Sequence, residues 1–137
     1  VLEDGTMIAQ SMAILEYLEE IAPTWYFNVP LGFQFLLDEM ERNDRLARQF
    51  FSRLRMLMYA GAGMSRSVWD RLNAMADRWV PGGLPIVSGL GATETGPFAL
   101  YYTDRKDAPG SIGIPARGVT LKLVPQGDKL EARLKSP

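Results

Sequence analysis

The chain of 137 residues contains no cysteine and no histidine. These two absences exclude disulfides, thiolate or imidazole metal ligands, cysteine nucleophiles and Ser-His-Asp triads within this chain. Any metal ion that binds here must therefore have oxygen ligands.

An excess of charge of one sign is also absent, because 15 Lys and Arg side chains balance 16 Asp and Glu side chains. A net charge of -1 creates no general field for nucleic acid or an anionic membrane. No apolar run approaches the roughly 20 residues that a membrane helix needs, and no signal-like leader opens the chain. We therefore expect a cytoplasmic protein with neither nucleic acid nor a membrane as a partner.

The composition is that of a globular protein, with 47% hydrophobic and 23% charged residues. Val1-Leu2 resembles a strand already under way, and Ser136-Pro137 follows directly after another predicted strand. We therefore expect both ends to be truncated.

Residues 1–21 predict a strand, a turn, a second strand and a helix. Apolar residues flank Asp4-Gly5, a pair typical of a two-residue hairpin turn. Ser11 is then placed to cap a helix whose apolar face extends to Ile21.

The middle of the chain predicts helices and one buried strand. Pro23 ends the first helix, since proline disfavours helical geometry at the residue before it. Helical spacing of apolar residues returns over 33–40 and again over 46–54. The almost continuous apolar run 54–60 predicts a strand of a parallel sheet, and Ser65 is placed to cap the helix that follows.

The remaining pattern predicts a short strand over 86–88, a polar turn over 89–97 and an antiparallel hairpin over 119–134. Strand, glycine turn, helix and strand make a βαβ unit, so the fold class is α/β. Ligands of such units bind at the carboxyl ends of the strands. Those ends are residues 60–62 and 90–92.

Residues 91–97 combine glycines, hydroxyls and one carboxylate directly after a strand. Glycine lets the backbone approach a ligand, and Thr93 can bond a phosphate oxygen. Glu94 can supply one oxygen to Mg²⁺, which keeps water and phosphate oxygens as its other ligands. A plain capped loop is the alternative explanation of the same pattern.

Three motifs resemble those of the AMP-forming acyl-CoA synthetases, in that family's order. Gly91-Ala92-Thr93-Glu94 resembles the core motif, and residues 60–65 (Ala-Gly-Ala-Gly-Met-Ser) resemble the adenine-edge motif. Residues 110–115 (Gly-Ser-Ile-Gly-Ile-Pro) resemble the segment that leads into the small β-barrel subdomain. Within this superfamily, residues 23–33 and 88–97 look most like feruloyl-CoA synthetases.

The resemblance implies a parent enzyme that uses ATP, Mg²⁺ and coenzyme A. It would convert a small substrate, a hydroxycinnamate or similar aryl acid, into an acyl-adenylate and then into an acyl-CoA thioester. Residues 22–137 would be a fragment of the N-terminal AMP-binding domain of that ligase, a βαβ unit plus a β-hairpin. The implied site residues are Gly61, Ala62, Gly91, Ala92 and Thr93 for the nucleotide, Glu94 for the metal, and Asn28, Gly32, Gly89 and Leu90 for the acyl pocket.

Parts that the family needs for catalysis are not found in this sequence: a Ser/Thr/Gly-rich phosphate loop, a ribose-binding aspartate and a C-terminal catalytic lysine. Catalysis by preorganised charge is lost with the groups that supply it. We therefore assign no catalytic residue and expect this chain to be inactive in adenylation.

Residues 1–21 resemble a different family, the glutathione transferases, in which a Gln-Ser or Glu-Ser pair opens a helix of the thioredoxin-like domain. The resemblance implies a ββα piece that binds glutathione through Gln10 and Ser11, with a domain boundary before Ala22. A simple helix cap explains Ser11 equally well. Two alternative functions stay open: a glutathione transferase relative, and a module that binds ATP or AMP weakly.

Overall fold

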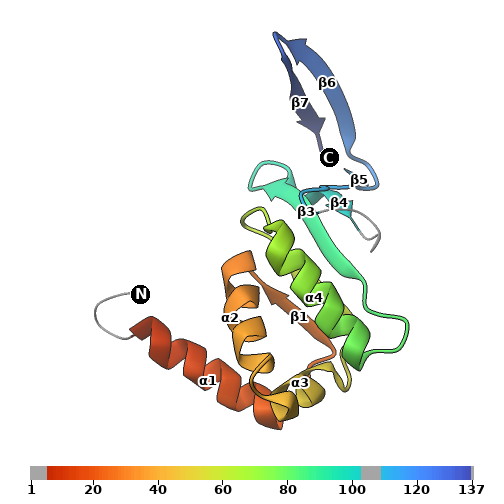
Figure 1. Cartoon of the computed structure of the whole chain (residues 1–137). Helices are drawn as coiled ribbons and strands as arrows, with labels where there is room; N and C mark the ends of the chain where they lie inside the picture. Colours follow the sequence, from red (N-terminus) through yellow and green to blue (C-terminus); the bar gives the residue numbers. More distant parts are fainter. Residues whose placement is uncertain (1–5, 103–108, 137) are drawn as a thin grey trace.

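The computed structural model describes residues 6–102 and 109–136, with the side chains of the first helix described from Ala13 onward (Figure 1). The four helices lie in the first two thirds of this part, with strands between them, and the described elements after α4 are all strands. In chain order the elements are α1 (Thr6–Glu20), β1 (Trp25–Asn28), α2 (Pro30–Met40), α3 (Asp44–Phe51), β2 (Met56–Tyr59), α4 (Arg66–Trp79), β3 (Ile86–Ala92), β4 (Gly96–Tyr102), β5 (Ile114–Pro115), β6 (Thr120–Gln126) and β7 (Lys129–Lys135).

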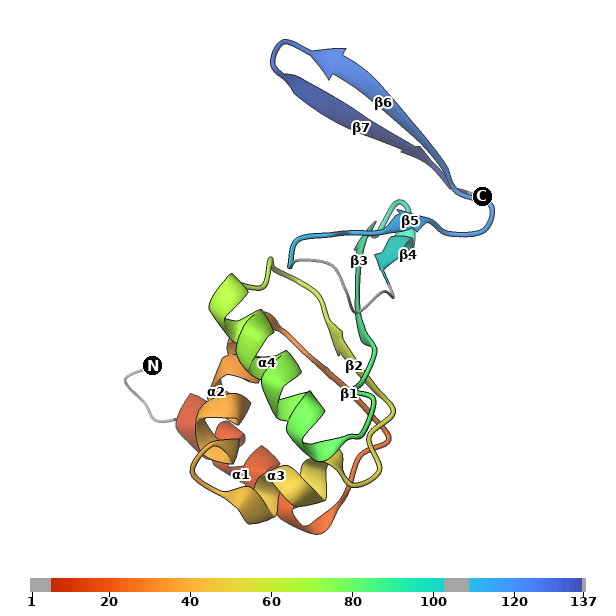
Figure 2. The ribbon, with the colours of Figure 1, turned by 45° about the vertical axis from the view of Figure 1, so that its right-hand side comes forward.

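The main sheet has five strands in the order β1-β2-β3-β4-β5. β1, β2 and β3 are parallel, whereas β4 and β5 are antiparallel to their neighbours. Figure 2 shows the helices gathered on one side of β1 and β2, and the β6–β7 hairpin projecting away from them. The α/β class and the predicted βαβ unit, β2-α4-β3, are confirmed.

Local signals in the sequence explain where the helices begin. Pro30 occupies the first turn of α2, where its missing N–H costs no hydrogen bond. The side chain of Asn43 accepts a hydrogen bond from the Leu46 amide at 3.1 Å and caps α3. Ser65 accepts one from the Val68 amide at 3.3 Å and caps α4, as the sequence predicts.

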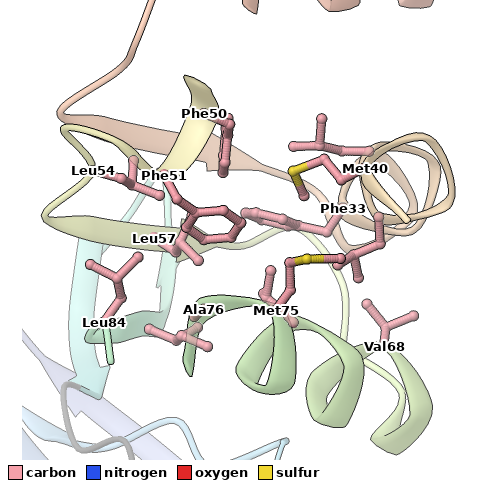
Figure 3. Close-up of a cluster of buried hydrophobic side chains, with 14 of the residues drawn as sticks. Phe33, Met40, Phe50, Phe51, Leu54, Leu57, Val68, Met75, Ala76 and Leu84 are labelled. Carbon is pink, nitrogen blue, oxygen red and sulfur yellow. The ribbon is translucent and has the colours of Figure 1, made fainter. Parts of the chain in front are cut away.

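One buried cluster of side chains joins the helices to the parallel strands (Figure 3). Tyr26 on β1 contacts the ring edges of Phe33 and Phe50, with centroid distances of 5.7 and 5.1 Å. Leu57 on β2 is completely buried beside them. This core holds β1 and β2 in place, so it also determines where their carboxyl ends lie.

The predicted strand over Thr6–Ala9 is wrong, because these residues form the first turns of α1. Ser11 therefore lies inside this helix and does not cap it, while Val1–Gly5 lie outside the described residues. Leu18 belongs to the buried core and Leu15 packs against that core, so the helix has one apolar side. Four residues are too few to distinguish a strand pattern from a helix pattern.

Strand β1 was not predicted from the sequence, and β3 is longer than the strand predicted over 86–88. Trp25–Asn28 is rich in aromatic residues that favour strands and lies between two prolines, so a strand signal is present. β3 continues to Ala92, so residues 89–92 of the predicted turn belong to a strand. Glycines suggested a loop there, but in the structure they allow β4 to approach closely.

The predicted C-terminal hairpin is confirmed as β6 and β7, joined by Gly127-Asp128. Apolar residues are cross-strand partners, as in the pair Leu121 and Leu134. Leu123 and Leu130 are nonetheless 53% and 61% exposed. Within the described residues, this apolar face is therefore not covered by the core.

Candidate nucleotide site

The carboxyl ends of β2 and β3 border a cavity of about 440 Å³. Its walls come from three segments that are far apart in the sequence. The lining residues are Tyr59, Ala60, Gly61, Ala62 and Gly63 after β2, Ser88, Gly89, Leu90 and Gly91 on β3 with Pro97 on β4, and Gly110, Ser111 and Ile112 before β5.

Parallel pairing brings the first two segments together. Met58 is the register partner of Val87, so the chain leaves β2 beside the second half of β3. Gly61 has a φ of +85°, a conformation that favours glycine, and it turns the chain away from the strand. A Cβ at Gly61 would lie 3.4 Å from the Val29 side chain, in ordinary contact.

The floor of the cavity is largely backbone, because β4 lies very close to the glycines of β3. A Cβ at Gly89 would overlap the Leu100 carbonyl oxygen, and one at Gly91 would overlap the Pro97 carbonyl oxygen. These positions need glycine for space, and the result is a surface that a flat ligand can approach closely.

A tight turn follows the floor. The Thr95 amide donates to the Ala92 carbonyl at 3.1 Å, and the Ala92 amide donates to Thr95 Oγ1 at 3.0 Å. Thr93 and Glu94 occupy the two corners and are exposed. Neither corner side chain has a hydrogen-bond partner among the described residues.

The cavity brings together five of the predicted site residues: Gly61, Ala62, Gly89, Leu90 and Gly91. Ala92, Thr93 and Glu94 lie on the adjacent turn and not in the lining. Their roles with phosphate and metal stay predictions.

Asn28 and Gly32 are also outside the cavity lining. Asn28 Nδ2 donates to the Tyr26 hydroxyl at 2.9 Å, and its Oδ1 accepts from the Val29 amide at 2.8 Å. The Asn28 side chain fills the space that a Cβ at Gly32 would need. Their assignment to an acyl group stays a prediction.

Six side chains that line the cavity were given no role from the sequence: Tyr59, Ala60, Ser88, Pro97, Ser111 and Ile112. Tyr59 and Ser88 directly precede the predicted site segments, and both are buried. Ser111 and Ile112 belong to the third motif, which was interpreted only as a connection to a subdomain. The order of the three motifs was a signal that all of them serve one site.

The titratable groups of this region fit an oxygen-bound ion rather than a protein-built metal cage. Within the described residues no group of three or more potential Cys, His, Asp or Glu ligands is found. A Mg²⁺ ion at Glu94 would take its remaining ligands from water and phosphate, which is usual for this ion.

Burial raises the pKa of Tyr26, on β1, above its ordinary value, and the hydrogen bond with Asn28 partly opposes that shift.

Comparison with known families identifies the chain. Residues 1–134 match the profile of the AMP-binding enzymes. The chain belongs to the AMP-binding enzyme family. The match confirms the family resemblance, and each of the three motifs that carry it contributes residues to the cavity wall.

Solved structures share the fold at low sequence identity. A benzoate CoA ligase from Burkholderia xenovorans LB400 aligns with a TM-score of 0.69 and 24% identity, over 93% of this chain and 25% of that one. An anthranilate CoA ligase in complex with anthranoyl-AMP aligns with a TM-score of 0.68 and 22% identity, over 92% and 24%. This AMP-binding chain thus spans about a quarter of their length. No curated protein sequence matches it.

The family match includes residues 1–21, for which a piece like the glutathione transferases was expected. In the structure Gln10 and Ser11 lie inside α1, so they do not present a helix N-terminus to a ligand. Leu18 of α1 belongs to the same buried cluster as the rest of the core. The boundary before Ala22 and the glutathione role stay predictions.

No helix in the described part of the chain is long and apolar enough to cross a membrane.

Proposed function

We propose that this chain is the nucleotide-binding part of an AMP-forming carboxylate–CoA ligase that acts on a hydroxycinnamate or a similar aryl acid. The observation that carries the proposal is the cavity itself. Three segments with family-like motifs, which are separate in the sequence, line one space with a glycine floor. The balanced charge of the chain supplies no field for a polyanion and so supports a small-molecule ligand. A cytoplasmic location is part of the same proposal.

The nucleotide base would lie between the turn after β2 and the strand β3. Gly61 and Ala62 border one side, and Gly91 leaves the backbone of the other side accessible. Thr93 and Glu94 lie at the end of the same strand, where a phosphate attached to the nucleoside would extend. A Mg²⁺ ion held by Glu94 would neutralise phosphate charge there.

The aryl acid would occupy the apolar part of the same space. Leu90 and Ile112 give this part of the wall an apolar surface, and Gly89 leaves room beside them. An aromatic ring suits such a surface, since apolar pockets with few polar groups bind flat ligands. Hydroxycinnamate is preferred because residues 23–33 and 88–97 resemble feruloyl-CoA synthetases. Benzoate and anthranilate ligases share the fold.

The chain by itself is proposed to bind nucleotide without completing the adenylation reaction. ATP, coenzyme A and the acid would react only where the phosphate loop and the catalytic lysine of the family are also present. Pyrophosphate release by this chain on addition of ATP, Mg²⁺ and ferulate would contradict this part of the proposal.

The direct test is calorimetric titration of the chain with AMP in the presence and absence of Mg²⁺. We expect saturable binding that Mg²⁺ strengthens, and a loss of that Mg²⁺ effect in Glu94→Gln. Glu16→Gln is the matched control, because Glu16 is exposed on α1. Absence of AMP binding at millimolar concentration would overturn the proposal, and the same titration with glutathione tests the roles predicted for Gln10 and Ser11.

A further inference from the structure

Thr95 bonds the turn from both its backbone and its side chain. Its amide closes the turn onto the Ala92 carbonyl at 3.1 Å, and its Oγ1 accepts the Ala92 amide at 3.0 Å. The same hydroxyl lies 3.4 Å from the Gly96 carbonyl oxygen, to which it donates. Both ends of the corner Thr93-Glu94 are therefore tied together through one residue.

The residues that flank this turn impose little restraint of their own. Gly91 and Gly96 have no side chains, and a Cβ at Gly96 would meet no heavy atom within 4 Å. The ladder between β3 and β4 is also irregular here, with a register shift between Leu90 and Ala92. Pairing resumes at Ala92 and Gly96, so the strands bring the two ends of the corner together, while no side chain of either glycine holds it.

A second side chain reaches the turn, but at another point. Ser136 Oγ donates to the Glu94 carbonyl at 3.4 Å, a longer contact to an exposed group. In the described residues, Thr95 is the one side chain that bonds the Ala92 amide, and Ala92 directly follows the cavity floor. The position of the corner relative to the cavity therefore depends on the Thr95 hydroxyl.

We propose that Thr95 is a positioning residue for the nucleotide site. Its hydroxyl holds the Ala92 amide and thereby directs the Thr93 hydroxyl and the Glu94 carboxylate toward one place beyond the cavity floor. Thr95 itself touches no ligand. That Thr95 fixes the position of the corner is inferred from the hydrogen bonds alone. That this position affects the binding of AMP and Mg²⁺ rests on the proposed function.

The positional part is tested on the whole chain by nuclear magnetic resonance, without nucleotide. We compare Thr95→Val, which removes the hydroxyl at nearly constant shape, with Thr95→Ser, which keeps it. In Thr95→Val the Ala92 amide should exchange about fivefold faster, the ratio expected for one neutral hydrogen bond. The backbone couplings of Thr93 and Glu94 should change in the same variant and return in Thr95→Ser.

Two further variants serve as a replacement and a control in this experiment. Thr95→Ala repeats the loss of the hydroxyl without a β-branched side chain, in case Thr95→Val does not fold. Thr120→Val makes the same substitution at an exposed position at the start of β6 and should change neither measurement. Unchanged Ala92 exchange, or unchanged couplings at Thr93 and Glu94 despite faster exchange, would overturn the inference.

The consequence for the ligand is tested by titration with AMP and Mg²⁺. We expect affinity about fivefold lower in Thr95→Val and restored in Thr95→Ser. Equal affinity of the two variants would show that the corner does not need this positioning. If the unsubstituted chain binds no AMP, the proposed function fails, while the exchange and coupling results still decide the position of the corner.

Discussion

Gly91 on β3 lies directly against the carbonyl oxygen of Pro97 on β4, so closely that a Cβ at Gly91 would overlap this oxygen. The two strands can approach in this way only where a side chain is missing. Since Gly91 also lines the cavity, one residue type serves both the strand packing and the shape of the site.

The substitution Gly91→Ala should therefore destabilise the chain by about 1–3 kcal/mol, because β4 or the floor must move to make room for the methyl group. Urea denaturation measures this change. Gly63→Ala is the control, because a Cβ at Gly63 meets nothing within 4 Å and its φ is not positive. Equal stability of the two variants would show that β3 and β4 are not closely packed at Gly91.

Ser65→Ala should cost about 1 kcal/mol of stability, because it removes the side-chain acceptor that bonds the Val68 amide at the start of α4. Thermal unfolding followed by circular dichroism measures the effect. Ser67→Ala is the comparison, since Ser67 is exposed inside the first turn and replacement by alanine there favours the helix. A larger loss in Ser67→Ala than in Ser65→Ala would contradict the capping role.

The stability of the fold should fall at high pH through Tyr26. Burial raises the pKa of Tyr26, so the folded state favours the neutral phenol. This contribution is complete below the ordinary tyrosine pKa of about 10 and is lost as the pH rises through the raised value. Absorbance titration should show a late tyrosine ionisation step, and Tyr26→Phe should remove that step.

Tyr17→Phe serves as the reference for this titration, because Tyr17 is 62% exposed. This substitution should leave the late step unchanged. A late step that persists in Tyr26→Phe would assign the raised pKa to another tyrosine.

Local patterns predicted the elements whose signals lie within a few residues. The capped helix after Ser65 and the hairpin near Gly127 are examples, since a cap or a turn depends on neighbours in the chain. The same reasoning failed at Thr6–Ala9, where a short segment fits two periodicities and the structure has a helix. It also interpreted Gly89 and Gly91 as a loop, because close strand contact is not visible in a local window.

By itself, the sequence determined the α/β class, the main helices and the three motifs that point to the AMP-binding family. These features follow from residue spacing, turn chemistry and motif order, all of which are properties of short segments. Only the tertiary structure decided that Tyr59, Ser88 and Ser111 meet around one cavity and that Asn28 turns toward Tyr26 instead. The physical reason is that strand register and the packing of the common core set these distances, and both depend on residues far apart in the chain.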